Sequence, residues 1–98
     1  MNRSFAIDLE AEADLADAKK WYDERREGLG SEFIEKVDDA FQTIQRILLV
    51  PHIVFNDLRR ILLRRFPYAV FYRVSESRIT IVAVYHTSRD PRGWQSRG

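Results

Sequence analysis

The stretch RRILLRRFPY at positions 59–68 gives the clearest indication of the fold. Its apolar positions alternate with a period of two, which predicts a β-strand over residues 59–66. Pro67 interrupts this strand because proline cannot donate to a sheet ladder. The same period returns in residues 68–74 and 78–86, which we therefore expect to be two more strands. Because the connections between the three strands are short, we expect antiparallel neighbours.

The alternation also predicts which side chains face the core. The first of these strands divides its apolar side chains between two faces, Ile61 with Leu63 and Leu62 with Phe66. The more apolar face of the last strand, which we expect to pack on the helices, consists of Ile79, Ile81, Ala83 and Tyr85. The opposite face of that strand is polar at both ends, so we expect it to be open or only partly covered.

Upstream of these strands the hydrophobic period is 3.6, which predicts two helices. The first spans residues 11–26, and its apolar stripe consists of Ala11, Leu15, Ala18 and Tyr22. The second spans residues 31–49, and its apolar stripe consists of Phe33, Val37, Phe41, Ile44 and Leu48. Between them Gly28-Leu29-Gly30 predicts a turn, and Pro51 ends the second helix because the residue before a proline avoids helical backbone.

These elements predict an α+β protein in which a helical hairpin packs on a small antiparallel sheet. Residues 3–7 alternate weakly and add a candidate edge strand. With 98 residues, no repeat and no flexible linker, residues 1–98 are expected to form a single domain. The sequence has no cysteine, no leader-like segment and no run near the ~20 apolar residues of a membrane span. We therefore expect a cytoplasmic protein without disulfides, a cysteine-type zinc site or a thiol nucleophile.

The formal net charge of +1 conceals an asymmetry between the two halves of the chain. Residues 1–50 contain seven Lys or Arg and twelve Asp or Glu, whereas residues 51–98 contain nine Arg, no Lys and three acidic residues. Such an excess of arginine predicts a surface for an anionic or acidic partner. Mutual neutralisation of the halves is the alternative, but it would involve only the rims of the packed elements. Alternation predicts that the four central arginines divide between the sheet faces, Arg60 with Arg64 and Arg59 with Arg65.

Two more side chains of this half are candidates for chemistry or recognition. His86 titrates in the range of acid–base catalysts, although a lone histidine at a strand end is more often a hydrogen-bonded structural residue. Trp94 either stacks on a nucleobase or pins the polar tail to the sheet. The nearly continuous apolar stretch Ile47–Phe55 exceeds what a small core needs, so an exposed part of it would be a groove for a partner.

Three separate pieces of the sequence resemble the RelE/ParE superfamily of bacterial toxins, matching in order its helical hairpin, its arginine-rich strand and its closing strand with the tail. The pieces are Trp21-Tyr22 with Gly28-Leu29-Gly30 and Phe33, the stretch 59–68, and the stretch 81–86 with Arg89-Asp90-Pro91 and Trp94. The resemblance covers essentially the whole chain and implies a β-α-α-β-β-β fold. It also implies a toxin of a type II toxin–antitoxin system, neutralised by a small partner protein.

The resemblance is closer to the ParE members, which act by binding DNA gyrase, than to the RelE members, which cut mRNA on the ribosome. Cleavage of RNA needs a base for the 2′-hydroxyl, an acid for the leaving oxygen and cations for the phosphorane. Arginine cannot be that base, and all three lysines lie in the predicted helices, not on the sheet. His86 is therefore the most credible base, ahead of Tyr72 and Tyr85.

The resulting hypothesis is a growth-inhibiting, plasmid-stabilising toxin that binds gyrase and forms a hetero-oligomer with its cognate antitoxin. The side chains expected to contact the target or partner are Arg59, Arg60, Arg64, Arg65, Arg89 and Trp94. The alternative is a ribosome-dependent mRNA endoribonuclease on the same fold, which would act through Arg65, His86 and Arg89. A further alternative is a non-toxic relative that binds only its partner or a nucleic acid. None of these hypotheses includes a metal, a cofactor or a membrane.

Overall fold

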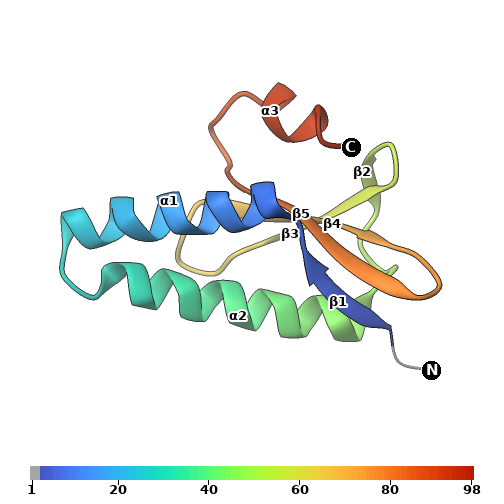
Figure 1. The fold of residues 1–98 in the computed structure, drawn as a ribbon, viewed down its shortest axis with the longest axis horizontal. Coiled ribbons are helices and arrows are strands. Elements are labelled where there is room, and N and C mark those ends of the chain that lie inside the picture. The colour runs from blue at the N-terminus through green and yellow to red at the C-terminus, as the bar shows by residue number, and fades with distance from the viewer. Residues whose placement is uncertain (1–2) are drawn as a thin grey trace.

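The computed structural model describes residues 3–98 and places two long helices on one face of a five-stranded sheet (Figure 1). The elements are β1 (Ser4–Ile7), α1 (Leu9–Arg25), α2 (Leu29–Ile47), β2 (Ile53–Phe55), β3 (Leu58–Leu62), β4 (Tyr68–Val74), β5 (Arg78–His86) and α3 (Arg92–Gln95). The strands lie in the order β1-β5-β4-β3-β2. The predicted α+β class, with a helical hairpin on a sheet, is confirmed. No helix within residues 3–98 is both long enough and apolar enough to cross a membrane.

Helix α1 begins two residues earlier than predicted because strand β1 runs directly into it. The backbone N–H of Asp8 still donates to the carbonyl oxygen of Ile81 at 2.9 Å, as in the sheet ladder. The carbonyl oxygen of Asp8 already accepts from the N–H of Glu12 at 3.0 Å, which closes the first helical turn. Glu10 and Glu12 in this first turn and Arg25 in the last turn complement the helix dipole.

The turn between the two helices is tighter than predicted because α2 already begins at Leu29. Gly28, which precedes α2, has a φ of 85°, in the left-handed region that favours glycine. The N–H of Gly30 donates to the carboxylate of Asp23 on α1 at 2.7 Å. A Cβ atom added at Gly30 would lie 2.5 Å from the carbonyl oxygen of Lys19. The helices therefore approach each other closely at their joined ends, where only a glycine fits without a shift.

Strand β3 ends at Leu62, four residues before its predicted end. The chain then bends, and Arg65 adopts a left-handed φ of 69°. As a result Leu63 and Phe66 both turn into the core beneath the helices, while Leu62 stays exposed. The prediction that Leu62 and Phe66 share a face is therefore wrong. So is the division of Arg64 and Arg65 between the faces of a strand, because both lie in the β3–β4 loop.

The two edges of the sheet are formed by short strands. Strand β1 confirms the candidate strand at residues 3–7 and runs parallel to the first half of β5, which makes the sheet mixed. Strand β2 pairs antiparallel with the start of β3. Sequence alternation does not predict β2, because its three residues are too few to display a period.

An extra residue in β5 forms a β-bulge opposite β4. Ile81 pairs with Tyr72 and Ala83 pairs with Phe71, so two steps along β5 correspond to one step along β4. Val82 is therefore left without a partner in the ladder. A bulge of this kind reverses the inward and outward positions of the residues that follow it, because side chains alternate with a period of two.

The bulge changes which residues of β5 face the helices. Ile79 and Ile81, which precede it, pack in the core beneath the helices, as predicted. Ala83 and Tyr85, which follow it, pack on the opposite face, and Val84 takes the place beneath the helices. The prediction that Ala83 and Tyr85 face the helices is therefore wrong.

The C-terminal tail covers part of the face of the sheet that lies away from α1 and α2 (Figure 1). Trp94 of α3 is 8% exposed and stacks on Phe71 with 3.9 Å between ring centroids. Leu58, Ala83 and Tyr85 complete this second core. The tail covers only part of this face, because Arg60, Leu62 and Arg78 stay exposed on it. The expectation that the face is only partly covered is thus confirmed, and the covered part is the one on which Trp94 packs.

Candidate functional site

Two of the predicted contact arginines are engaged within the protein itself. Arg59 on β3 is half-buried and donates to the carbonyl oxygens of Leu49 and Pro51 at 3.0 Å and 2.6 Å. Arg65 in the β3–β4 loop pairs with Glu32 of α2 at 3.0 Å, with 53% of its side chain exposed. Arg59 therefore holds the segment that leads into β2, and Arg65 holds its loop against the helical hairpin.

Glu32 binds two guanidinium groups at once. Its second carboxylate oxygen accepts from Arg26 at 3.0 Å, beside the contact with Arg65. Hydrogen bonds from Arg65 and from Arg26 hold the pKa of the Glu32 carboxyl below its usual value. This carboxylate thereby links the β3–β4 loop to the helical hairpin, in addition to Leu63 and Phe66, which anchor the loop in the core.

The remaining three predicted arginines, Arg60, Arg64 and Arg89, are exposed and form no ion pair with any residue of the described range 3–98. Arg60 and Arg89 line one shallow hollow of about 130 Å³ on the face closed by α3. Arg64 lines a different hollow, of about 330 Å³, together with Lys36 and Arg46 of α2. The structure thus brings Arg60 and Arg89 together and leaves Arg64 apart from them.

The sixth predicted contact residue, Trp94, borders the same hollow as Arg60 and Arg89 but is buried. Its indole ring is engaged with Phe71, and Phe55 meets it edge-on with 6.0 Å between centroids. Of its two predicted roles, the pinning of the tail is the one that the packing supports.

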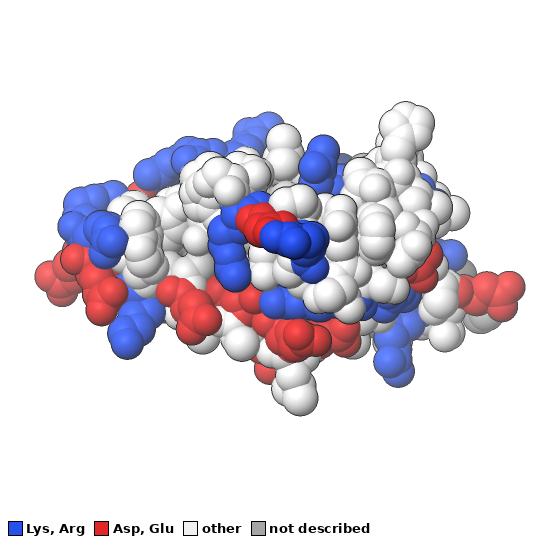
Figure 2. Space-filling view, turned by 90° about the horizontal axis from the view of Figure 1, so that it is seen from above, with Lys and Arg blue, Asp and Glu red and all other residues white. Residues whose placement is uncertain are grey.

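Charge is unevenly distributed over the surface. In Figure 2 acidic side chains gather along the lower margin of the view, where some Lys and Arg side chains also lie, whereas the charged side chains of the upper margin are mostly Lys and Arg. The imbalance between the halves of the sequence is therefore also an imbalance in space. Internal ion pairs neutralise part of it, such as those of Arg73 with Asp57 and Arg65 with Glu32.

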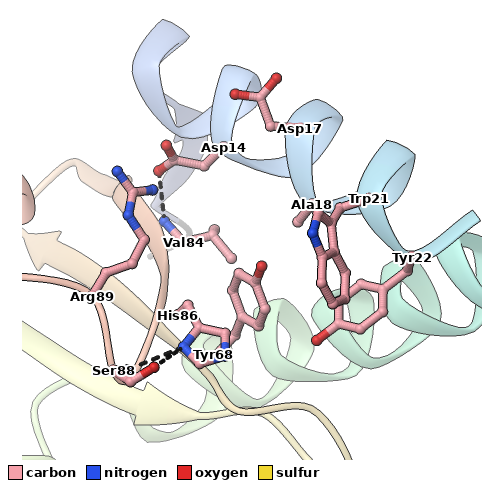
Figure 3. A pocket seen from close by; sticks show the side chains of 10 residues that line it. All are labelled: Asp14, Asp17, Ala18, Trp21, Tyr22, Tyr68, Val84, His86, Ser88 and Arg89. Atoms are coloured by element: carbon pink, nitrogen blue, oxygen red, sulfur yellow. Dashed lines mark hydrogen bonds between the residues drawn. The ribbon is translucent and has the colours of Figure 1, made fainter. Parts of the chain in front are cut away.

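His86 is the last residue of β5, and its ring contacts Ser88 and Tyr68. The backbone N–H of Ser88 donates to Nδ1 at 3.0 Å, and the Ser88 hydroxyl lies 2.8 Å from the same nitrogen (Figure 3). A backbone N–H can only donate, so Nδ1 is the acceptor in this contact. The ring meets Tyr68 edge-on, with 5.2 Å between centroids. Ser88 therefore occupies Nδ1, and Nε2 is the ring nitrogen left for other contacts.

Next to His86, helix α1 and the ends of β4 and β5 enclose a hollow of about 430 Å³, here termed the α1 hollow (Figure 3). The side chains that give it its chemical character are Asp17, Trp21, Tyr22, Tyr68, His86 and Arg89. Burial raises the pKa of the Tyr22 and Tyr68 hydroxyls, so both remain protonated at neutral pH. Within residues 3–98 no three side chains are grouped as metal ligands would be. The hollow therefore offers aromatic rings, hydroxyl and indole donors, one guanidinium and two carboxylates, of which Asp14 is paired with Arg97.

The sequence reasoning does not single out this hollow. It interprets Trp21 and Tyr22 as part of the hairpin packing and the acidic positions of α1 as a solvated face. Helical spacing is the signal that could have indicated one wall, because Asp14, Asp17 and Trp21 recur at i, i+3 and i+7. The facing wall comes from β4 and β5, which are distant in the sequence, so no local pattern reveals that the two walls meet.

One end of the α1 hollow is bounded by an ion pair between α1 and the tail. Arg97 donates to both carboxylate oxygens of Asp14, at 2.7 Å and 3.1 Å, and this hydrogen bonding raises the pKa of Arg97. Asp14 also accepts from the N–H of Val84 at 3.0 Å, and Arg97 also donates to the carbonyl oxygen of Val82 at 3.2 Å. The pair therefore covers the edge of β5 beyond the end of β1, where the backbone would otherwise be unpaired.

Comparison with known proteins adds two findings. A family model described as "ParE toxin of type II toxin-antitoxin system, parDE" matches residues 6–91 of the chain. A solved structure described as "Chromosomal ParDE TA system from P. aeruginosa" has a similar fold, with a TM-score of 0.78 and 17% sequence identity over 88% of this chain and 97% of that chain. At this identity the likeness shows the fold alone. No curated protein matches the sequence.

Proposed function

We propose that this chain, which belongs to the ParE toxin family of type II toxin–antitoxin systems, stops growth by binding DNA gyrase in the cytoplasm. Residues 1–98 would form one toxin domain whose activity is binding, not catalysis. The observation that carries the proposal is that Arg60, Arg64 and Arg89 are exposed and have no acidic partner within residues 3–98. Guanidinium groups pair with carboxylates through charge-assisted hydrogen bonds, so these three are available to an acidic patch on a target protein.

The setting of His86 argues against the endoribonuclease alternative. That mechanism would need His86 to take a proton from a 2′-hydroxyl, but its Nδ1 is already engaged with the backbone N–H and the hydroxyl of Ser88. Arg65, the second residue of the alternative, is paired with Glu32, so only Arg89 lies with His86 at one hollow. Arginine remains protonated in proteins and cannot serve as the base.

The proposal includes a cognate antitoxin that covers the free edge of β2 and forms a hetero-oligomer with the toxin. Four apolar residues are exposed in and before this strand: Leu49 (56%), Val50 (77%), Ile53 (51%) and Val54 (40%). An edge strand presents unpaired backbone groups that an extended peptide can bind by adding a strand. An antitoxin tail that is both apolar and acidic would bury these side chains and pair with nearby arginines. Such a toxin–antitoxin pair would serve plasmid stabilisation.

A supercoiling assay with purified proteins tests the gyrase proposal. The wild-type toxin should block supercoiling of relaxed plasmid, and mRNA translated in its presence should remain uncut. Replacement of Arg60, Arg64 and Arg89 by Gln should weaken the inhibition about tenfold, since exposed ion pairs contribute roughly 0.5 kcal/mol each. Arg78→Gln is the matched control, because Arg78 is also exposed and unpaired within residues 3–98 but lies at the opposite end of β5 from His86.

Expression of a His86 variant in a bacterial host distinguishes gyrase binding from the endoribonuclease alternative. Under the gyrase proposal His86→Ala should leave growth inhibition intact, because His86 performs no chemistry. Under the endoribonuclease alternative the same change should cost ~10²–10⁴-fold in cleavage, the usual contribution of a general acid or base. Discrete ribosome-dependent cuts in mRNA, mapped by primer extension and lost in His86→Ala, would overturn the proposal.

A further inference from the structure

The α1 hollow contains polar groups that the fold itself does not use. The hydroxyls of Tyr22 and Tyr68 and the indole N–H of Trp21 form no hydrogen bond within residues 3–98, and none of them is sealed from solvent. Tyr72 provides the contrast, since its hydroxyl donates to the carbonyl oxygen of Leu48 at 2.8 Å. In Figure 3 the Tyr68 hydroxyl points into the space beneath α1, which Trp21 borders from the side. These donors are therefore presented together to whatever enters the hollow.

The charges around the hollow restrict what can enter. Asp14 is already neutralised by Arg97 and by the N–H of Val84, so Asp17 is the carboxylate that remains free to accept. Arg89 stands across the hollow from Trp21 (Figure 3), and the guanidinium of Arg25 covers the Trp21 ring at 3.7 Å. Two guanidinium groups beside one free carboxylate disfavour a cationic ligand. A purely apolar ligand would leave the phenol and indole donors without acceptors.

The class of ligand that suits these groups is a flat molecule with hydrogen-bond acceptors on one edge for the phenol and indole donors. It also has adjacent hydrogen-bond donors on another edge for Asp17 and an anionic group for Arg89. The size agrees, because about 430 Å³ lies within the range of small-molecule sites. We propose that the α1 hollow binds a guanine nucleotide, either free or as an unpaired base in a single strand. Guanine presents O6 and N7 as acceptors and N1–H with the N2 amine as neighbouring donors.

Each group of the ligand has a counterpart in the hollow. Asp17 accepts from N1–H and the N2 amine, while the Tyr68 hydroxyl and the Trp21 indole donate to acceptors of the base. The aromatic side chains supply stacking surface, which contributes to the binding of unpaired bases of any sequence. Arg89 pairs with the phosphate. Adenine lacks the two adjacent donors that one carboxylate can accept together, so it should bind more weakly.

The two tryptophans provide a test within one molecule. Trp21 borders the α1 hollow, whereas Trp94 is buried on the opposite face of the sheet against Phe71. In two-dimensional NMR of the ¹⁵N-labelled full chain, GMP should shift the indole N–H signal of Trp21 in a saturable way and leave that of Trp94 in place. Trp21→Phe assigns the two signals. Guanosine should bind more weakly than GMP, because it lacks the phosphate for Arg89, and AMP should bind about tenfold more weakly.

Variants of the lining separate recognition from folding. Asp17→Asn should reduce the preference for GMP over AMP about tenfold, and Tyr68→Phe should weaken GMP binding while the aromatic ring remains. Glu12→Gln is the matched control, because it removes a charge from the same helix outside the hollow. An unchanged Trp94 signal reports that each variant is folded. A trinucleotide with guanine between two thymidines that binds tenfold more tightly than GMP would identify a nucleic acid as the source, and equal binding would identify the free nucleotide.

Three results would overturn the inference: no shift of Trp21 at millimolar GMP, equal shifts of Trp21 and Trp94, or no change of preference in Asp17→Asn. A shift of Trp21 by the antitoxin in the absence of any response to nucleotides would assign the hollow to a protein partner and would likewise overturn it. Nucleotide binding goes beyond the gyrase proposal and does not depend on it. Asp17→Asn should therefore inhibit supercoiling as the wild type does, so failure of one proposal leaves the other intact.

Discussion

At the scale of single residues, the local partner of each arginine decides its role. Nothing in the sequence distinguishes Arg59 from Arg65. In the structure, Arg59 donates hydrogen bonds to backbone carbonyl oxygens, whereas Arg65 forms an ion pair with Glu32. Arg60 and Arg89 have no such partner within residues 3–98, and this makes them available at the surface. A charged side chain in a basic stretch is therefore a contact residue only where the fold leaves it unpaired.

The paired state of Glu32 predicts a pH-dependent stability. Its pKa is lowered from the usual 4.5 in the folded state, so its contribution is present above pH 4.5 and is lost as the pH falls through the lowered folded value. Glu32→Gln should thus unfold at lower urea concentration than the wild type at neutral pH, and the two should converge in acid. The effect should be small because the ion pairs are exposed.

Urea titrations at pH 7 and at about pH 2 measure this difference. Glu35→Gln is the control, since Glu35 lies three residues further along α2, is exposed and forms no ion pair within residues 3–98. A gap between Glu32→Gln and the wild type that persists unchanged in acid would show that the ion pairs are not its cause.

At the scale of elements, close packing between neighbours matters more than the strength of each element alone. Helices α1 and α2 touch where Gly30 passes Lys19 and Asp23, and the tail lies on the sheet where Trp94 meets Phe71. Both contacts depend on the size of a single side chain. Each therefore gives a prediction about stability.

Gly30→Ala should destabilise the hairpin by about 1–3 kcal/mol, the usual cost of adding atoms to a tightly packed site. The new Cβ would lie 2.5 Å from the carbonyl oxygen of Lys19 and 2.6 Å from the Asp23 carboxylate, so the helix ends must separate. Chemical denaturation measures the loss, and the neighbouring Ser31→Ala, at an exposed position, serves as the control. An unchanged unfolding midpoint would mean that the joined ends of the helices can move apart freely.

Trp94→Ala should lower the free energy of unfolding by about 3–5 kcal/mol, as expected for the removal of a buried tryptophan. Trp94→Phe should lose less, because a phenyl ring can still stack on Phe71. Under the gyrase proposal, the folded Trp94→Phe protein should be as active as the wild type, since the indole is buried and not offered to a partner. Gln95→Ala controls for changes in α3. A loss below about 1 kcal/mol in Trp94→Ala would refute the pinning role of the tryptophan.

At the scale of the whole molecule, the uneven distribution of acidic and basic side chains over the surface favours orientation of the protein before contact with a charged partner (Figure 2). Under the gyrase proposal, the association rate should therefore fall between about 0.1 M and 1 M salt, as the Debye length shrinks from about 10 Å to 3 Å. Surface plasmon resonance measures the rate. The variant in which Gln replaces Arg60, Arg64 and Arg89 should show a shallower salt dependence, whereas Arg78→Gln should retain the wild-type slope. Equal slopes for all three proteins would exclude steering by these arginines.

Much of the fold could be predicted from local patterns, and the exceptions share a physical reason. The hydrophobic periods of 3.6 and 2 each repeat over a few consecutive residues, so both helices and three of the strands can be predicted from the sequence. The bulge at Val82 leaves no trace in the pattern, because it arises from the pairing of β5 with β4. The bend after Leu62 also leaves no trace in the pattern. The prediction that Leu63 and Phe66 lie on opposite faces assumes that the strand continues to residue 66, but it ends at Leu62.

The sequence by itself determines the α+β class, the helical hairpin, the resemblance to ParE toxins and the excess of arginine in the C-terminal half. Only the tertiary structure decides which arginines are unpaired, which nitrogen of His86 contacts Ser88 and which face of the sheet Trp94 covers. It alone creates the α1 hollow, from Trp21 on one side and Tyr68 on the other. The reason is the separation in the sequence between the residues that produce each feature. Helical and strand periods are local properties, whereas contacts such as that between Asp14 and Arg97 join residues 83 positions apart, and no local pattern specifies them.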